Sequence, residues 1–369
     1  MKLQFGIIGL EQAGKTTVFN ALCSAHASVG DYSSGKAANI AMVKIPDDRV
    51  DALAELFGSP KRVYAEIEFV DIAGMTAPGS ADRQAIAGQL KEGSYIHQLR
   101  MTQALLVVIR CFVDDNIPHP QGNVDPARDI NDIETELKLI DLVQIDKRVE
   151  NIQRLLKVKP TDKLKTEMAL MTRMKDQLES ERPLREMEFT KEDEQFLGSF
   201  RFLSIKPILY LLNLDENQIS QAAEMEKTLF PDSGKNKAVA SLCGKIEMEI
   251  QALDEKDRQD FLQELGIKKP AFEKVLQKSY DLLGLITFLT AAENESRAWP
   301  IPSGYTAVEA AGEIHTDLQR GFIKAETVHY DDLISLSGWN GARNAGKLRL
   351  EGKNYIVKDG DVILFKFNV

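Results

Sequence analysis

Short apolar segments alternate with more polar, helix-like segments through much of the chain. Continuous apolar runs rich in β-branched residues are typical of strands buried on both faces of a parallel sheet. The pattern therefore predicts an α/β domain with helices on both faces of that sheet. The predicted strands are LQFGIIGL (3–10), AEIEFVDIAG (65–74), ALLVVIRCF (104–112) and KPILYLLNL (206–214), and the first predicted helix is KTTVFNALCSA (15–25).

The periodicity changes between the third and fourth predicted strands. From about Asp129 to Asp193 the chain is charged, and its apolar residues recur at steps of three and four, as on one face of a helix. Pro160 must end the first helix. We expect an antiparallel helical hairpin inserted into the sheet domain, and its length favours a protruding arm. Two ordinary surface helices packed on the sheet are the alternative.

The C-terminal segment changes pattern again. Thr306 and Glu309 have the spacing of a capping box, which predicts a helix running to about Gln319. The final stretch, KLRLEGKNYIVKDGDVILFKFNV, alternates apolar and polar residues and carries turn signals at its two Gly residues that follow Glu351 and Asp359. This predicts a small mixed sheet wrapped on one helix, of β-grasp type.

Composition restricts the class of partner. The chain has 369 residues and a formal net charge of −10, with 43% hydrophobic and 28% charged residues. This length fits two or three domains. The acidic balance argues against a general nucleic-acid binder, and we expect no DNA partner. RNA contact is left to local basic segments such as 157–165 and 343–353, for which an ordinary solvated charge run is the alternative.

The cysteines and the N-terminus indicate the compartment. Cys23, Cys111 and Cys243 are far apart and form no CxxC pair, which favours a reducing cytoplasm over a disulfide framework or zinc site. The first apolar run is interrupted by glycines and Glu11, so it is too short for a signal peptide or a membrane span. We therefore expect a cytoplasmic protein without a membrane partner.

Candidate chemistry begins with a phosphate-binding loop. Gly9 to Thr16 (GLEQAGKT) satisfies G-x-x-x-x-G-K-S/T between a predicted strand and a predicted helix. The glycines let backbone N–H groups approach phosphate oxygens, and the helix directs its positive end at them. Lys15 would reach the β- and γ-phosphates as a catalytic group, and the Thr16 hydroxyl would bind Mg²⁺. The predicted nucleotide-binding residues of this loop are Gln12, Ala13, Gly14, Lys15, Thr16 and Thr17.

A second motif closes the second predicted strand. Asp71 of Asp-Ile-Ala-Gly74 can hold Mg²⁺ through water, and the Gly74 N–H can sense a γ-phosphate. Many switch GTPases place a Gln after that glycine to orient the attacking water, whereas this chain has Met75. Because a thioether cannot orient water, hydrolysis must be slow, use another group or need a partner.

The fourth predicted strand ends in a candidate base reader. A guanine reader shows Asn-Lys-x-Asp, and this chain has Asn213-Leu214-Asp215-Glu216. Glu216 is one methylene longer than Asp, and Leu214 replaces the Lys that lies over the base. A bidentate site tolerates such a shift poorly. We therefore expect weak guanine discrimination, with adenine accepted. A strand-end turn unrelated to any base is the alternative.

With these motifs in place, the sequence resembles the YchF family of Obg-like ATPases nearly end to end, as a divergent member. The matching residues are VIRCF (108–112), DDNIPH (114–119), the NLDE stretch, AAGEIHTDLQRGFIKAE (310–326) and AGKLRLEGKNYIVKDGDVILFKFNV (345–369). The resemblance implies a TRAFAC-class G domain with a coiled-coil insertion and a C-terminal TGS domain. The corresponding division is 1–128 and 194–283 for the G domain, 129–193 for the coiled coil and 284–369 for the TGS domain.

The resemblance also implies chemistry and partners. It implies ATP preferred over GTP, slow hydrolysis, Mg²⁺, and association with ribosomes, with RNA contact through the TGS domain and the coiled coil. Met75 fits the family's hydrophobic replacement of the catalytic Gln. His119, in the family's D-N-x-x-H motif, corresponds to a loop histidine that serves near the phosphates, with a solvated loop histidine as the alternative. Cys243 and Gly244 complete the base pocket by the same resemblance.

Three departures from the family pattern lie in the P-loop and in the two switch segments. Gln12 replaces the Asn that the family links to a potassium site, which puts potassium activation in question. Switch I lacks the Mg²⁺-binding Thr, for which Ser33 or Ser34 could substitute, and switch II (76–90) has lost most of its glycines. The expected function is a slow, Mg²⁺-dependent ATPase that acts as a ribosome-associated switch. A nucleotide-binding scaffold with negligible hydrolysis and a true GTPase are the alternatives.

Overall fold

The structure is a computed structural model, and it describes residues 3–28, 39–72, 94–232, 234, 236–253, 255–264 and 270–368. The chain divides into two compact units. The larger unit comprises Gln4–Met42 and Glu68–Lys278, and the smaller comprises Met1–Leu3, Val43–Ile67 and Ser279–Val369. Each unit is built on its own sheet.

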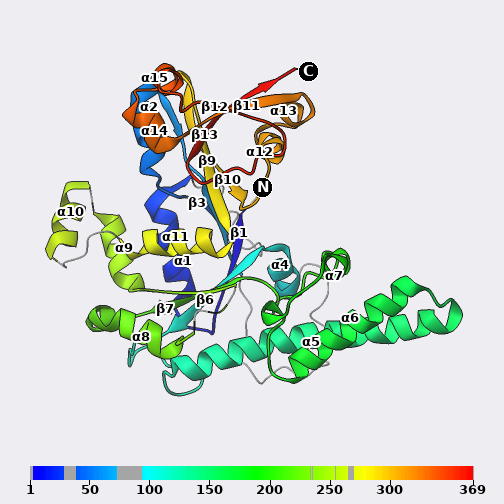
Figure 1. Cartoon of the computed structure of the whole chain (residues 1–369). Coiled ribbons are helices and arrows are strands. Elements are labelled where there is room, and N and C mark those ends of the chain that lie inside the picture. The colour runs from blue at the N-terminus through cyan, green and yellow to red at the C-terminus, as the bar shows by residue number, and fades with distance from the viewer. Residues whose placement is uncertain are drawn as a thin grey trace. The chain divides into compact units, whose positions relative to one another are not determined.

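The larger unit is built on a sheet whose strands run in the order β2-β3-β5-β1-β6-β7-β8 (Figure 1). The central pairs β5-β1, β1-β6, β6-β7 and β7-β8 are all parallel, as the apolar runs predict. The α/β fold class is therefore confirmed. The strands are β1 (Gln4–Ile8), β2 (Ala27–Ser28), β3 (Asn39–Lys44), β5 (Glu66–Asp71), β6 (Ala104–Arg110), β7 (Ile208–Asn213) and β8 (Lys237–Leu242).

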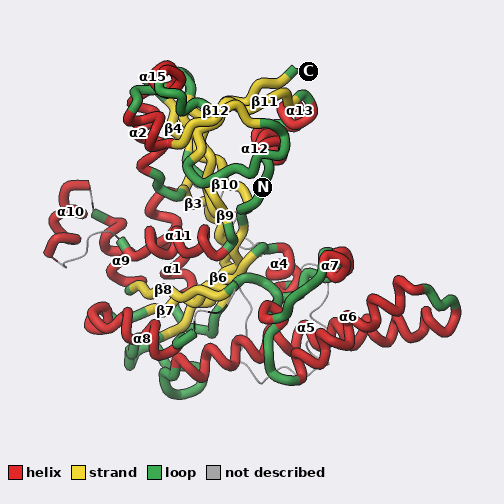
Figure 2. The backbone as a smooth tube through the Cα atoms, viewed as in Figure 1, coloured by secondary structure: helices red, strands yellow, loops and turns green. Residues whose placement is uncertain are grey.

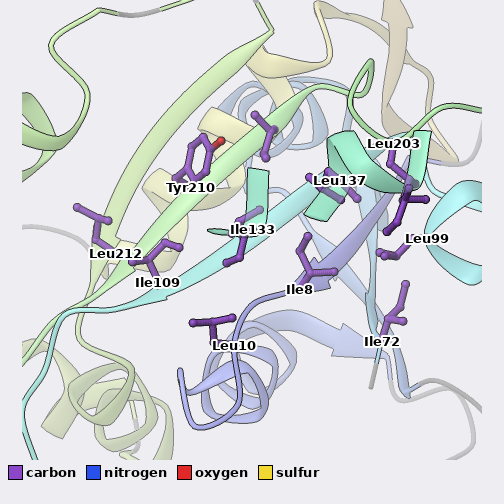
Figure 3. Close-up of a cluster of buried hydrophobic side chains, with 14 of the residues drawn as sticks. Ile8, Leu10, Ile72, Leu99, Ile109, Ile133, Leu137, Leu203, Tyr210 and Leu212 are labelled. Carbon is purple, nitrogen blue, oxygen red and sulfur yellow. The ribbon is translucent and has the colours of Figure 1, made fainter. Parts of the chain in front are cut away.

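Helices connect these strands and bury their two faces. One face packs Ile8, Ile109 and Tyr210 against side chains of α4 and α5 (Figure 3). Residues of the opposite parity, such as Phe5 and Phe69, lie on the other face, with their tilted rings 5.7 Å apart between centroids. The helices of this unit are α1 (Lys15–His26), α4 (Tyr95–Met101), α8 (Ala222–Leu229), α9 (Gly244–Ala252), α10 (Glu255–Glu264) and α11 (Ala271–Leu282), with a 3-10 turn at Glu216–Gln221.

The predicted helical hairpin is present. Its first helix, α5 (Pro126–Val158), is capped by Asp125, and its second, α6 (Asp162–Glu179), is capped by Thr161. Lys159 precedes Pro160 and takes an extended conformation, which ends α5 as the proline requires. The inner half of α5 packs on the sheet, and its outer half packs with α6 around Ile145, Ile152 and the α6 methionines. The two helices extend side by side away from the sheet (Figure 2).

A short segment returns the chain from the hairpin to β7. It contains a 3-10 turn (Leu184–Glu186) and α7 (Lys191–Leu197), which begins with a capping box between Thr190 and Asp193. Asp141 of α5 is fully buried and accepts hydrogen bonds from the backbone N–H groups of Leu203 (2.9 Å) and Ser204 (2.7 Å). These bonds fix the returning segment to the base of the hairpin.

The smaller unit is a mixed sheet in the order β12-β11-β13-β9-β10-β4, packed on α12 as the β-grasp prediction requires. The strands are β4 (Lys61–Val63), β9 (Leu285–Ala291), β10 (Glu295–Pro302), β11 (Phe322–His329), β12 (Arg349–Glu351) and β13 (Asp361–Phe367). The helices are α2 (Asp48–Phe57), α12 (Ala307–Ile314), α13 (Thr316–Arg320), α14 (Tyr330–Ser335) and α15 (Trp339–Asn344).

Two details of the smaller unit differ from the sequence pattern. The capping box of Thr306 and Glu309 opens α12, but the helix stops at Ile314. His315 is extended and caps a separate helix, α13, so the single helix predicted to about Gln319 is two. Residues 43–67, which lie within the first predicted G-domain segment, contribute α2 and β4 to this unit. The proposed boundaries at 128, 193 and 283 remain predictions.

Candidate nucleotide-binding site

The phosphate-binding loop joins the end of β1 to the start of α1 and depends on two glycines. Gly9 and Gly14 have φ angles of +153° and +90°, in the region that favours glycine. A Cβ at Gly14 would lie 2.3 Å from Nδ2 of Asn213, and one at Gly9 would lie 2.4 Å from the Val108 carbonyl oxygen. The loop therefore has room for neither side chain. Gln12 also has a positive φ, of 60°.

Lys15 begins α1 and folds back over the loop. Its ammonium group donates to the carbonyl oxygens of Gly9 (2.9 Å) and Leu10 (2.8 Å). Burial lowers the pKa of Lys15, and the negative charges of Asp71 and Glu11 oppose that shift. The lysine is thus held as a partly desolvated cation at the loop, where an anionic ligand could replace the carbonyl acceptors. Thr16 is exposed on the first turn of α1.

Asp71 ends β5, beside the loop. In the parallel pairing of β5 with β1, Asp71 lies opposite Ile7, two residues before Gly9. Burial raises the pKa of the Asp71 carboxyl, while the charge of Lys15 and a hydrogen bond with the Asn39 side chain lower it. Lys15 and Asp71 are therefore electrostatically coupled at one edge of the sheet. Gly74, Met75, Ser33 and Ser34 lie outside the described residues.

The metal-binding residues expected from the sequence do not make a complete site alone. Within the described ranges, no group of three or more His, Cys, Asp or Glu side chains could hold a metal ion. Thr16 carries a hydroxyl group and Asp71 carries a carboxylate group. Such a pair suits Mg²⁺, which commonly takes its remaining ligands from water and substrate phosphates.

Asn213 ends β7 and connects two parts of the predicted site. Its Nδ2 donates to the carbonyl oxygen of Ala13 in the loop (3.0 Å), and its Oδ1 accepts from the N–H of Gly244 (3.1 Å). Asn213 is 4% exposed, so these two bonds satisfy a buried amide. A Cβ built on Gly244 would lie 3.2 Å from both Asn213 Oδ1 and Thr17 Cγ2. The structure therefore brings the loop, the end of β7 and the start of α9 together at Asn213.

The remaining residues of the predicted base pocket differ in exposure. Leu214 is buried and donates through its N–H to Leu242 (2.8 Å). Cys243 is also buried, and burial is the largest cause of the raised pKa of its thiol. Glu216 is exposed and accepts a hydrogen bond from the Lys245 ammonium group (2.8 Å).

His119 is buried and bonded to groups of its own and the following segment. Its Nδ1 accepts from the N–H of Gln121 (3.2 Å), and its Nε2 lies 2.9 Å from Oδ2 of Asp129 in the first turn of α5. The other oxygen of Asp129 accepts from Arg128. The His119 side chain is 2% exposed. Both ring nitrogens are therefore engaged with protein groups, and the catalytic role of His119 stays a prediction.

Sequence reasoning missed three residues around the site. Arg110, 2% exposed at the end of β6, donates to the carbonyl oxygens of Ile117 (2.8 Å) and Phe112 (3.2 Å) and lies 4.5 Å from the Phe112 ring centroid. The Phe112 ring comes within 3.9 Å of a Cβ built on Gly14. Lys245 is the third. The sequence did contain a signal for these three residues. Arg110 and Phe112 follow a predicted strand whose end lies next to the loop, and Lys245 directly follows Cys243-Gly244.

This chain is similar to known proteins over its whole length. Residues 4–213 match the family described as 50S ribosome-binding GTPase, and residues 285–368 match the YchF-GTPase C-terminal family, described as a protein of unknown function (DUF933). The ribosome-binding ATPase YchF of Bacillus subtilis (strain 168) is 41% identical, over the full length of both chains. The chain belongs to the YchF family. The ribosome-binding ATPase YchF of Escherichia coli O157:H7 is 38% identical, also over both full lengths.

Solved structures agree with the YchF fold. The YchF GTPase of Schizosaccharomyces pombe aligns with a TM-score of 0.84 at 28% identity, covering 99% of this chain and 98% of that one. A GTP-binding protein from Pyrococcus horikoshii OT3 aligns at 15% identity with a TM-score of 0.59, covering 99% and 100% of the two chains, and shows the shared fold alone. None of the described helices combines the length and apolar character needed to span a membrane.

Proposed function

We propose that this YchF-family chain is a Mg²⁺-dependent purine-nucleotide-binding ATPase that hydrolyses slowly and acts in the cytoplasm as a ribosome-associated switch. The observation that carries the proposal is the convergence of the P-loop, Asp71 and Asn213 at the carboxyl ends of β1, β5 and β7. Ligands of open parallel sheets bind at that edge.

In this proposal the loop and α1 bind the phosphates. The ammonium group of Lys15, now on the Gly9 and Leu10 carbonyls, would turn to the β- and γ-phosphates. Mg²⁺ would neutralise phosphate charge, held by the Thr16 hydroxyl and, through water, by Asp71. The partly desolvated charges of Lys15 and Asp71 support these roles, because electrostatic interactions are stronger where water is excluded.

The groups at the end of β7 support acceptance of ATP, because they lack the features of a guanine-specific site. Guanine recognition uses a free carboxylate to accept from the base N1–H and the 2-amino group. Here Glu216 is already paired with Lys245, and Leu214 supplies no ammonium group. The Asn213 side chain forms its hydrogen bonds with the backbone of Ala13 and Gly244 rather than with a base. We infer a pocket that holds a purine by packing and discriminates weakly between purines, with the Phe112 ring as a further apolar surface beside the loop.

Two features support slow turnover. Met75 occupies the position where many switch GTPases have a water-orienting Gln. His119, the candidate replacement, is buried against Asp129. The same two features favour the second candidate function, a nucleotide-stabilised binding module with negligible hydrolysis. The relatives are named as ribosome-binding ATPases, which supports a ribosomal partner and an ATPase activity for this chain.

Single-turnover hydrolysis of γ-labelled ATP with Mg²⁺ separates the two candidates. We expect cleavage above the uncatalysed rate in the wild type and none above that rate in Lys15→Ala. Tight ATP binding with cleavage at the uncatalysed rate would contradict the ATPase and favour the binding module. Competition calorimetry with ADP and GDP tests the third possibility, since a true GTPase requires much tighter GDP binding.

A further inference from the structure

Arg110 is a buried cation at the end of β6. The residue is 2% exposed and lies opposite Asn213 in the parallel pairing of β6 with β7. Among the described residues, the hydrogen-bond acceptors of Arg110 are all backbone carbonyl oxygens. Arg185, comparably buried at 4%, instead pairs with the Glu134 carboxylate (2.7 Å). Because a buried charge is costly unless it is well paired, the placement of Arg110 points to a role beyond packing.

The guanidinium group of Arg110 gathers carbonyl oxygens of the loop that follows β6. Its Nε donates to Phe112 (3.2 Å), and its Nη2 donates to Ile117 (2.8 Å) and, at 3.5 Å, to Asp114. Residues 111–119 form turns without a helix or strand that would fix their backbone. A guanidinium group carries five N–H donors in a rigid planar fork, so one group can hold several carbonyls in one arrangement. Arg110 therefore fixes the path of the chain from Phe112 to Ile117.

The same guanidinium group lies over the aromatic ring of Phe112. The Cζ atom of Arg110 is 4.5 Å from the centroid of that ring, a distance at which a cation and a π-system attract each other. The Phe112 ring also approaches the phosphate-binding loop, because its Cε1 lies 3.9 Å from a Cβ built on Gly14. Phe112 is only half-buried, so part of the ring is open to a ligand beside the loop. Aromatic rings of this kind stack with bases of any sequence.

We propose that Arg110 is a positioning residue that sets the Phe112 ring against the purine of the bound nucleotide. Arg110 acts through Phe112 and does not itself touch the ligand. The inference rests on the proposed function, since it requires a purine at this edge of the sheet. Lysine cannot replace Arg110, because an ammonium group is a point charge with neither the planar fork nor a face for stacking.

The test measures ADP affinity of the full chain by calorimetry in the presence of Mg²⁺. The proteins compared are the wild type, Arg110→Lys, Phe112→Leu and the double variant. Arg185→Lys is the matched control, since it makes the same change at a comparably buried arginine that pairs with a carboxylate. Circular dichroism and the melting temperature verify folding. If Arg110→Lys does not fold, Arg110→Gln replaces it, because an amide keeps a planar donor and buries no charge.

We expect Arg110→Lys to lose about tenfold in ADP affinity, the scale of one contact between a base and an aromatic ring. Phe112→Leu should lose a similar factor. The double variant should bind ADP no more weakly than Phe112→Leu, because residues that act through one contact are not additive. Affinity for inorganic tripolyphosphate, which carries phosphates without a base, should stay within about twofold of wild type in each variant. Arg185→Lys should change neither affinity.

Several outcomes would overturn this inference. Unchanged ADP affinity in Arg110→Lys would remove the positioning role. An equal loss for ADP and tripolyphosphate would mean that Arg110 supports the phosphate-binding loop instead of the base. A further loss on adding Arg110→Lys to Phe112→Leu would mean that Arg110 acts through another group.

The binding measurements also separate this inference from the proposed function. ATP cleavage at the uncatalysed rate would contradict the ATPase, while the ADP affinities of the variants would still decide the role of Arg110. Conversely, if the wild type binds tripolyphosphate as tightly as ADP and still cleaves ATP, the base makes no useful contact and only the inference about Arg110 is wrong.

Discussion

The side-chain amide of Asn213 donates to the Ala13 carbonyl oxygen at 3.0 Å, which joins the end of β7 to the phosphate-binding loop. The same side chain accepts from the Gly244 N–H, so one buried amide aligns the loop with the start of α9. The predicted phosphate-binding and base-binding segments are therefore aligned by a side chain whose two hydrogen bonds both go to protein backbone.

Asn213→Ala should weaken nucleotide binding without changing purine preference. The substitution leaves the Ala13 carbonyl and the Gly244 N–H unpaired and should cost about 1–3 kcal/mol of folding stability. ADP and GDP affinities should each fall about tenfold or more, measured by calorimetry. Asn217→Ala, on the exposed 3-10 turn, is the control. A change in ADP affinity alone would mean that Asn213 reads the base.

Restoring the guanine signature should change the base preference. Leu214→Lys with Glu216→Asp gives Asn-Lys-Asp-Asp and supplies both the shorter acid and the ammonium group. The ratio of GDP to ADP affinity should rise about tenfold or more in competition calorimetry, since a site built to hydrogen-bond its ligand discriminates strongly. Glu216→Asp alone is the matched control and should change the ratio less. No gain in the double variant would show that neighbouring groups set the preference.

Weakening the contact between His119 and Asp129 should raise turnover if the histidine acts at the phosphates. Asp129→Asn keeps the shape but replaces a charged acceptor by a neutral one, a loss of about 1 kcal/mol. We expect an increase of about fivefold in single-turnover hydrolysis, with ATP affinity unchanged. The gain should vanish in His119→Ala with Asp129→Asn. An equal rate in both backgrounds would remove His119 from the mechanism.

Lys206 should make stability depend on pH. Burial lowers the pKa of its ammonium group from 10.5 to about 8, although it donates to the carbonyls of Arg100 (3.2 Å) and Thr102. Because the folded pKa lies below the unfolded one, the cost of keeping the charge buried is fully present below pH 8. It is relieved as pH rises from about 8 toward 10.5, where the unfolded chain holds more protons.

Urea unfolding at about pH 7.5 and 9.5 checks this dependence. The wild type should gain about 2 kcal/mol of stability relative to Lys206→Met between the two values. Because both proteins share all other titrating groups, the contributions of those groups to the pH dependence cancel in the comparison. The opposite sign, or parallel curves, would contradict the assignment of the lowered pKa to Lys206.

The sequence predicted most of the larger unit because its signals are local. The P-loop glycines and the apolar runs of β1, β6 and β7 each specify one element, and parallel pairing then brings their ends together. Pro160 ends α5, as its ring requires. β8 was missed because only its second half is buried, so it shows no continuous apolar run.

Other features depend on contacts that no local pattern contains. β4 pairs with β10 across more than two hundred residues of sequence, so its place in the smaller sheet could not be read from the three residues Lys61–Val63. Lys245 meets Glu216 and Asp129 meets His119 only after folding. The structure has two helices after Thr306 where one was predicted. The His315 side chain accepts a hydrogen bond from the Asp317 N–H and caps the N-terminus of the second helix, α13.

The continuity of α5 has a mechanical consequence. The helix has 33 residues, so it is about 50 Å long, and about half of that length lies beyond the part that packs on the sheet. A rotation of about 10° at the inner half would therefore move the outer end by about 4 Å. Any strain that a bound ligand places on the sheet-facing residues Ile133 and Leu137 would be converted by this single rigid element into a much larger displacement at its far end.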